Sequence, residues 1–223
     1  MLSWDLLFYY SINFIFLTQI KNISASDVLL SEAFYPIFKT ILLVPLTALI
    51  EKIGKRNSLI FANAMNVLSI LSYILANNLT LVLVGQFLSA VAFDIKGMVE
   101  TNLLYDSLPK NEKRGYWFSK IDGKGMAWYY YAEAITSIAS GFLYIINGYL
   151  PFILCLTCCL LSTVLSFKFK NVKENKNNEI SNKQYIKGLK DSFKFIFKSS
   201  RLKYLFAFGA SFAALLGVLT SLR

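Results

Sequence analysis

The feature that most constrains this chain is a run of 37 consecutive residues, 57–93, that contains no charged side chain. A single α-helix of that length would extend for about 55 Å, because an α-helix rises about 1.5 Å per residue. The hydrocarbon core of a bilayer is only about 30 Å thick, so the run has to fold back on itself. The adjacent polar residues Asn77 and Asn78 mark the position of the turn.

A second uncharged run, 134–167, covers 34 residues and is interrupted at Asn147, Gly148 and Pro151. The composition agrees with a membrane location, because 56% of the residues are hydrophobic and 16% are charged. In soluble domains, about 45–50% of the residues are apolar and about 25% are charged. We therefore predict an all-α integral membrane protein. Its seven spans are expected at about 3–20, 28–50, 57–76, 79–103, 125–146, 149–168 and 203–222.

Lysine and arginine are distributed unevenly among the segments between these spans. Segments 51–56, 104–124 and 168–203 carry three, five and eleven of them, whereas the alternate segments carry only Lys21. Because positively charged loops remain in the cytoplasm, we predict a multi-pass protein of the cell membrane with a cytoplasmic N-terminus. The net charge of +10 is then a consequence of topology, and we expect no nucleic-acid partner.

The predicted organisation has three parts. Residues 1–170 form a six-helix transmembrane bundle, residues 171–202 form a cytoplasmic loop, and residues 203–222 form a seventh span. Within the loop, apolar side chains recur at helical spacing between lysines over 185–197. This pattern predicts an amphipathic helix that lies on the membrane surface.

Some kinds of chemistry are excluded by the residues that the chain lacks. It contains no histidine, which rules out histidine-based triads and two-histidine metal sites. Cys155, Cys158 and Cys159 have no fourth cysteine with which to complete a tetrahedral zinc site. We expect no catalytic residue, no metal and no cofactor, and we interpret the cysteines as small apolar residues that pack between helices.

Four charged residues are predicted inside the spans, where charge is expensive. Lys39, Asp94, Lys96 and Glu133 all lie about 10–16 Å from the cytoplasmic ends of their predicted helices. Asp94 and Lys96 are two positions apart, so they point to opposite sides of one helix. One interpretation is that these residues form internal ion pairs that lock the bundle. The other is that they line a site for a substrate or a coupling ion.

Aromatic residues mark the start of the fifth predicted span. Trp128 and three consecutive tyrosines, 129–131, are typical of a membrane interface. Tyr131 is also placed where it could line a cavity next to Glu133. Both interpretations remain open for Tyr131.

The most specific motif lies between the second and third spans. Glu51, Lys52, Gly54, Lys55 and Arg56 resemble a loop signature of the major facilitator superfamily, with Thr47 in place of its first glycine. That signature reads Gly, three residues, an acid, a base, any residue, Gly and two bases. Gly54 permits a tight turn, and Glu51 is placed to pair with a base.

Two further segments carry the resemblance. Residues 97–108 are similar to the end of the fourth helix in a group of bacterial members, where Asp106 is expected to pair with basic residues. Residues 16–24 are similar to the first helix of that group. By contrast, the fifth span lacks the glycine- and proline-rich signature of many drug exporters, which argues against drug efflux.

The resemblance covers nearly the whole chain and implies the N-terminal half of a twelve-helix secondary transporter. Such halves consist of inverted three-helix repeats around a central cavity. The implied function is the movement of a small solute across the bilayer by alternating access. The implied partners are the lipid bilayer, an unknown small-molecule substrate, and a second half or a second copy of the chain.

This resemblance assigns roles to the candidate residues. The transport cavity or coupling site comprises Lys39, Asp94, Lys96, Glu133 and Tyr131. The cytoplasmic gate comprises Glu51, Lys52, Gly54, Lys55, Arg56 and Asp106. Asp94 or Glu133 is also a candidate to carry a coupling proton, since burial favours the neutral form of a carboxyl group.

Two other hypotheses remain. The family would continue for five further helices, so the 223-residue chain is expected to be a truncated half. It would then be either a non-functional product or an accessory membrane subunit that needs a partner half. A membrane-embedded hydrolase is the third class; Asp94 and Glu133 are the only pair of acids at one depth that could serve it.

Overall fold

The computed structural model describes residues 8–109, 112–168, 204 and 208, and it divides into two compact units, Met1–Glu174 and Asn175–Arg223. In the second unit only Tyr204 and Phe208 are described, both in helical conformation. The predicted amphipathic helix 185–197 lies outside the described residues, as does nearly all of the predicted span 203–222.

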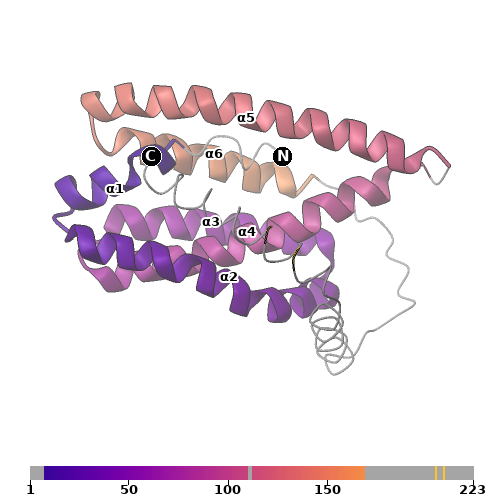
Figure 1. Ribbon diagram of the computed structural model, residues 1–223, viewed down its shortest axis with the longest axis horizontal. Helices are drawn as coiled ribbons and strands as arrows, with labels where there is room; N and C mark the ends of the chain where they lie inside the picture. Colours follow the sequence, from indigo (N-terminus) through magenta and orange to yellow (C-terminus); the bar gives the residue numbers. More distant parts are fainter. Residues whose placement is uncertain (1–7, 110–111, 169–203, 205–207, 209–223) are drawn as a thin grey trace. The chain divides into compact units, whose positions relative to one another are not determined.

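All the secondary-structure elements in the described part of the first unit are helices (Figure 1). It begins with a short helical stretch of 3-10, α and π turns, formed by η1 (Tyr10–Ile12), α1 (Asn13–Ile15) and η2 (Phe16–Ile20). Five longer helices follow: α2 (Ala25–Ile53), α3 (Lys55–Leu75), α4 (Leu79–Ser107), α5 (Arg114–Ile146) and α6 (Leu150–Ser166).

The ends of these helices have local causes in the sequence. Ser24 caps α2, because its Oγ accepts a hydrogen bond of 3.2 Å from the Asp27 backbone N–H. Asn78 caps α4 in the same way, with its Oδ1 accepting from the Leu81 N–H at 3.0 Å. The chain therefore turns between α3 and α4 at the polar pair Asn77-Asn78.

Helices α3 and α4 pack closely because a glycine lies at their contact. A Cβ atom built on Gly85 of α4 would lie 2.8 Å from Cε1 of Tyr73 in α3, closer than real Cβ contacts. The Ser69 hydroxyl donates a hydrogen bond of 2.8 Å to the Gly85 carbonyl at the same contact. Close approach of two backbones at small residues is typical of helices that associate within a bilayer.

Two clusters of buried apolar side chains form the core. The first joins the N-terminal helical stretch, α3 and α6, and includes Phe16, Tyr73 and Phe152. The second joins α2, α3 and α4, and includes Leu46, Ala62 and Ile95. Helix α4 is therefore central to the unit, whereas α5 is mostly exposed, with only Thr136 and Ser140 buried.

Within the described part of the chain, two helices are long and apolar enough to cross a membrane, α3 and α4. Helix α2 becomes a third if its two segments, which are bent by 54° at Pro45, count as one span. The bend has a local cause, because proline removes a hydrogen bond and clashes with the preceding turn. Helix α6 is apolar but has only 17 residues. The seven predicted spans therefore remain a prediction.

Most of the basic segment 104–124 is helical. Helix α4 continues to Ser107, and α5 begins at Arg114, eleven residues before the start of the span that was expected at 125–146. Helix α5 is consequently 33 residues long. A helix of about 50 Å exceeds the bilayer core, so part of it has to extend beyond the hydrocarbon region.

Candidate functional site

A charged pair joins α2 to α4 near the middle of both helices. Lys39 Nζ lies 3.5 Å from Asp94 Oδ1, and the two side chains are 41% and 6% exposed. The second carboxylate oxygen of Asp94, Oδ2, is buried and has no hydrogen-bond partner in the described residues. The pair thus combines a deeply buried acid with a base that reaches a partly open surface.

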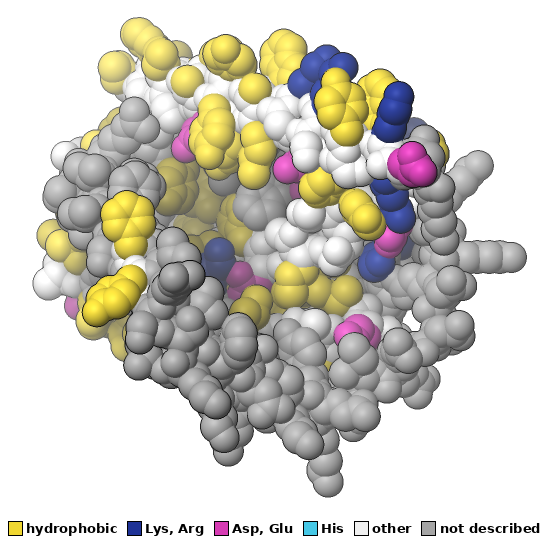
Figure 2. Space-filling model, turned by 45° about the vertical axis from the view of Figure 1, so that its right-hand side comes forward, with side chains coloured by type: hydrophobic (Ala, Val, Ile, Leu, Met, Phe, Trp, Pro, Cys, Tyr) yellow, Lys and Arg dark blue, Asp and Glu magenta, His cyan; other side chains and the backbone are white. Residues whose placement is uncertain are grey.

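A tyrosine ring lies beside this pair. Lys39 Nζ lies 5.7 Å from the ring centre of Tyr35, one turn earlier on α2. The Tyr35 hydroxyl interacts with the hydroxyl of Ser89 in α4 and lies near both Tyr10 and Asp94. Figure 2 shows a hollow on one face of the molecule, in which acidic and basic side chains lie below a row of hydrophobic ones.

Two further acids lie near Tyr10. Glu32 of α2 and Glu133 of α5 are close enough to interact electrostatically with the Tyr10 hydroxyl. Glu32, Tyr35 and Lys39 are three and four residues apart, so they share one face of α2. We call Tyr10, Glu32, Tyr35, Lys39, Asp94 and Glu133 the inner cluster.

Lys96 is on the other side of α4. Its side chain is fully buried, and its Nζ has no hydrogen-bond partner in the described residues. Its electrostatic neighbours are Cys155 and Cys159 of α6 and Glu100 of α4. Of the four charged residues expected at one depth, Lys39 and Asp94 form an ion pair, Lys96 is buried on the other side of α4, and Glu133 forms no ion pair among the described residues.

Tyr131 does not contact the residues of the inner cluster among the described interactions. Its side chain is 66% exposed, and its ring lies 6.4 Å from that of Trp128. Its role in a cavity therefore remains a prediction.

Asparagines join α3 to α6. Asn63 Nδ2 donates to Ser166 Oγ at 2.6 Å, and Asn66 Nδ2 donates to Cys159 Sγ at 3.2 Å. Hydrogen bonds of this kind hold helices together in lipid, where a polar side chain has no water to bind. Together with Lys96, these residues make the contact between α3, α4 and α6 unusually polar.

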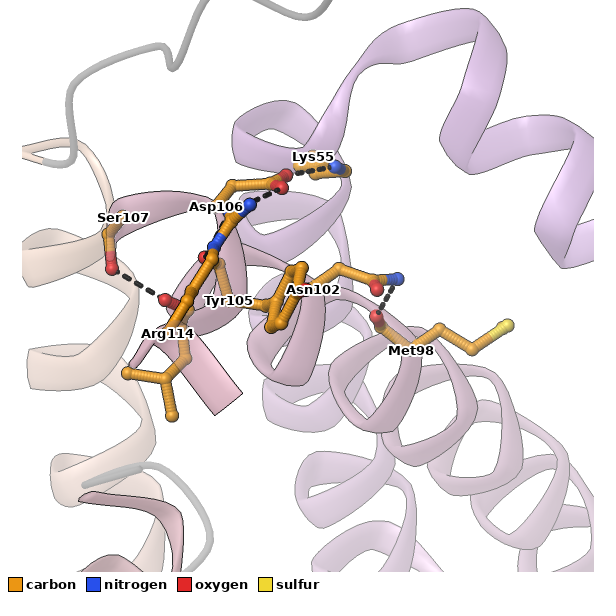
Figure 3. Close-up of polar contacts among 8 residues, drawn as sticks. Lys55, Met98, Asn102, Tyr105, Asp106, Ser107 and Arg114 are labelled. Carbon is orange, nitrogen blue, oxygen red and sulfur yellow. Dashed lines mark hydrogen bonds and ion pairs between the residues drawn. The ribbon is translucent and has the colours of Figure 1, made fainter. Parts of the chain in front are cut away.

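A second group of charges lies at the C-terminal end of α4 (Figure 3). Asp106 Oδ2 lies 2.5 Å from Lys55 Nζ, and Asp106 Oδ1 lies 3.7 Å from Arg114 Nη2. Arg114 also covers the ring of Tyr105 at 3.9 Å and donates from Nε to the Tyr105 carbonyl at 3.0 Å. Asp106 therefore connects the start of α3 to the start of α5.

Gly54 lies at the turn that positions Lys55. Its φ of 82° and ψ of 155° belong to a region that is essentially restricted to glycine, and this conformation ends α2 and begins α3 within one residue. Arg56, two positions later, donates to the Phe167 carbonyl at 2.6 Å. Lys52 is exposed.

Glu51 differs from the expectation that it would pair with a base. Its side chain is exposed, and it forms no ion pair within the described part of the chain. Asp106 is instead the acid that contacts Lys55, because the last turn of α4 brings it to the start of α3. The resemblance had led us to expect that Asp106 pairs with basic residues, and the structure identifies these residues as Lys55 and Arg114.

Sequence reasoning missed several residues. Arg114 was counted only as one of the positive charges of segment 104–124, and Tyr10, Glu32 and Tyr35 were not assigned to the cavity. A signal existed for the α2 residues, because Glu32, Tyr35 and Lys39 recur at helical spacing. No comparable signal linked Tyr10 to them, since Tyr10 belongs to a different helical stretch.

The arrangement does not suit a metal ion. Among the described residues, no three His, Cys, Asp or Glu side chains are grouped so that they could hold one. The structure instead describes a helical protein with two or three candidate membrane spans and an ion pair between α2 and α4, and charges inside apolar helices are typical of membrane proteins that carry a polar solute or ion.

Comparison with protein families is consistent with this class. The family model of the Major Facilitator Superfamily matches residues 2–222, so the chain belongs to the Major Facilitator Superfamily. Membership makes it a transmembrane transport protein rather than an enzyme, and places it in a lipid bilayer. A comparison with curated proteins finds no match.

Proposed function

We propose that the chain is part of a secondary active transporter that moves a small solute by alternating access, with the inner cluster lining its cavity. The observation that carries the proposal is the ion pair between Lys39 and Asp94. A charge in a bilayer is costly unless it faces a polar cavity or a partner. Here the acid is buried but Lys39 remains 41% exposed, which favours a cavity on the Lys39 side.

We further propose that the group around Asp106 is a cytoplasmic gate. The charges of Lys55, Asp106 and Arg114 hold the starts of α3 and α5 against the end of α4. A motion that opens the cavity to the cytoplasm would have to break or rotate these contacts. The cytoplasmic side is inferred from the basic residues of segments 51–56 and 104–124, which also supports a cytoplasmic N-terminus in the cell membrane.

The proposed cavity needs a second wall. The described helices provide one side of it, and the resemblance to twelve-helix transporters suggests that a second set of six helices closes it. Residues 1–170 would form the first set. The second set would come from another segment of chain or from a second copy.

Alternating access is tested by the reactivity of cysteines introduced into the cluster. Lys39→Cys is labelled with a membrane-impermeant maleimide in right-side-out and in inside-out vesicles, with the unsubstituted chain as the background control. Water reaches a transport cavity from both sides in turn, so we expect labelling in both preparations. Labelling in neither preparation would show that the pair only locks the bundle, and labelling from one side only would contradict alternating access.

A lipid-facing control is available on α5. Ile138 is 68% exposed and lies in the uncharged part of the helix. Ile138→Cys should resist the same reagent from both sides, because a thiol in hydrocarbon reacts poorly with a charged maleimide. This control separates access through a cavity from leakage of the reagent.

A further inference from the structure

One side of α5 carries large aromatic and basic side chains together. These are Trp117, Lys120, Lys124 and Trp128, which follow one another at intervals of three, four and four residues and so lie on one side of the helix. The two tryptophans are 42% and 74% exposed, and both lysines are exposed. We call these four residues the outer stripe of α5. Figure 2 shows basic and hydrophobic side chains together along its upper edge, where α5 lies in Figure 1.

The lysines of the outer stripe have no acidic partner in the part of the chain that the structure describes. The ion pairs found there join other residues. Asp122 is the nearest acid along α5, but it is half-buried and lies about 160–200° around the helix from both lysines. Lys120 instead lies beside aromatic rings, with its Nζ 5.7 Å from the ring centre of Tyr116 and 5.3 Å from that of Trp117. The stripe therefore presents positive charge to its surroundings.

The position of the stripe along α5 matches one edge of a bilayer. Helix α5 ends at Ile146, next to the polar residues Asn147 and Gly148. Measured from Ile146, a hydrocarbon core of about 30 Å accommodates about 20 residues of helix. Trp128 then lies just inside the core, whereas Lys124 and Lys120 lie about 3 Å and about 9 Å beyond it. This is the depth of the lipid head groups, where tryptophan and lysine are both enriched.

The same side of α5 is apolar beyond Trp128. Ile135, Phe142 and Ile146 follow it at intervals of seven, seven and four residues, and they are 67%, 68% and 75% exposed. Along this side of the helix, an apolar band is thus followed by a tryptophan and then by two lysines. A bilayer presents hydrocarbon, interface and charged head groups in the same order.

We infer that the outer stripe binds anionic phospholipid of the cytoplasmic leaflet, with Lys120 and Lys124 at the phosphate groups and Trp128 at the edge of the acyl chains. Charge complementarity is the argument for this occupant, because two exposed lysines without an acidic partner meet a negatively charged leaflet. The inference goes beyond the proposed function, since it requires the chain to lie in a bilayer but does not require a transport cavity.

Quenching of tryptophan fluorescence by brominated lipids tests the inference. The full chain, with Trp4→Phe and Trp117→Phe so that Trp128 is its only tryptophan, is reconstituted into phosphatidylcholine vesicles. Part of the lipid is replaced by dibrominated phosphatidylglycerol or by dibrominated phosphatidylcholine. We expect phosphatidylglycerol to be favoured at Trp128 by about fivefold or more, which is the effect of about one lysine near an anionic surface. Equal quenching by both lipids would overturn the inference.

Substitution of the lysines locates the site. The double variant Lys120→Gln, Lys124→Gln should lose the preference for phosphatidylglycerol at Trp128. The double variant Lys120→Arg, Lys124→Arg retains the charge and should retain the preference. A preference that persists in the glutamine variant would overturn the assignment of the lysines. Gel filtration in detergent shows that each variant is folded before its quenching is interpreted, and exposed lysines can be replaced at little cost in stability.

A matched reporter is available at the other end of α5. Ile146 lies 18 residues after Trp128, which is five full turns of an α-helix, so the two residues share one side of α5 about 27 Å apart. With Trp128→Phe and Ile146→Trp, the glutamine substitutions at Lys120 and Lys124 should leave the relative quenching by the two lipids unchanged. An equal fall at both reporters would show that only the net charge of the protein matters, and would overturn the site.

The alternative occupant of the stripe is another segment of protein, such as a second half or a second copy. In that case neither brominated lipid would quench Trp128 efficiently, and the lipid inference would be overturned. None of these outcomes depends on the labelling of Lys39→Cys, so failure of this inference and failure of alternating access are distinguishable.

Discussion

Neighbouring residues on one helix have different surroundings in this molecule. Asp94 and Lys96 are separated by one residue on α4, yet Asp94 contacts α2 and Lys96 is buried toward α6. Two positions correspond to about 200° around an α-helix, so the separation follows from helical geometry. Sequence alone predicts that these two charges diverge and that only the acid can pair with Lys39, but it does not tell which neighbouring helix each side of α4 faces.

At the scale of single residues, we predict how the Lys39–Asp94 ion pair contributes to the free energy of unfolding. Asp94→Asn leaves Lys39 without a counter-charge and should lower the free energy of unfolding by about 1–3 kcal/mol. The loss is smaller than for a fully buried pair because Lys39 is 41% exposed. The double variant Lys39→Met, Asp94→Asn should recover most of this stability, since no charge is left unpaired. Thermal unfolding in detergent measures both effects, and additive losses in the double variant would contradict the ion pair.

Between elements, the contact of α3 with α4 depends on one small residue. Gly85→Ala places a methyl group 2.8 Å from the ring of Tyr73, which is 2% exposed and enclosed by the first core cluster. We expect a loss of about 1–3 kcal/mol in the free energy of unfolding, because overpacking forces the ring or the helices to move.

The control for this prediction lies on the same helix. A Cβ atom at Gly97 has nothing within 4 Å, so Gly97→Ala should be neutral or stabilise α4 by up to about 1 kcal/mol. Thermal unfolding of the two variants in the same detergent makes the comparison. Equal stability of both would contradict the close packing of α3 and α4.

The charges around Asp106 make a prediction about how helices move. In the unsubstituted protein, Asp106 pairs with Lys55 at the start of α3 and with Arg114 at the start of α5. Asp106→Asn removes both ion pairs. Stability should change by less than about 1 kcal/mol, because these side chains are partly exposed. If the group is a gate, however, Lys39→Cys should be labelled faster in inside-out vesicles when Asp106→Asn is also present. Glu112→Gln should leave that rate unchanged, and an unchanged rate in Asp106→Asn would exclude the gate.

At the scale of the whole molecule, the distribution of lysine and arginine predicts which loops face the cytoplasm. Glu112→Cys, in the basic segment between α4 and α5, should be labelled by an impermeant maleimide only in inside-out vesicles. Asn77→Cys, in the turn between α3 and α4, should be labelled only in right-side-out vesicles. Both positions are exposed, so access depends on the side of the membrane rather than on burial. The reverse pattern would show that the orientation inferred from lysine and arginine is wrong.

The sequence by itself determined the class of this protein and the nature of its helices. Long uncharged runs can be accommodated only as helices that cross or lie within a bilayer, and capping residues such as Asn78 define helix ends locally. The loop motif with Gly54 indicated the family, which the match over residues 2–222 confirms. These features depend on neighbouring residues along the chain.

Only the tertiary structure decided which polar residues meet. The bases that meet Asp106 are Lys55 and Arg114, whereas Glu51 forms no ion pair among the described residues. Lys96 was grouped with Lys39 by depth, but the rotation of α4 places it against α6. Depth along a helix follows from counting residues, whereas contacts between helices depend on their rotation and spacing, which close packing at positions such as Gly85 determines.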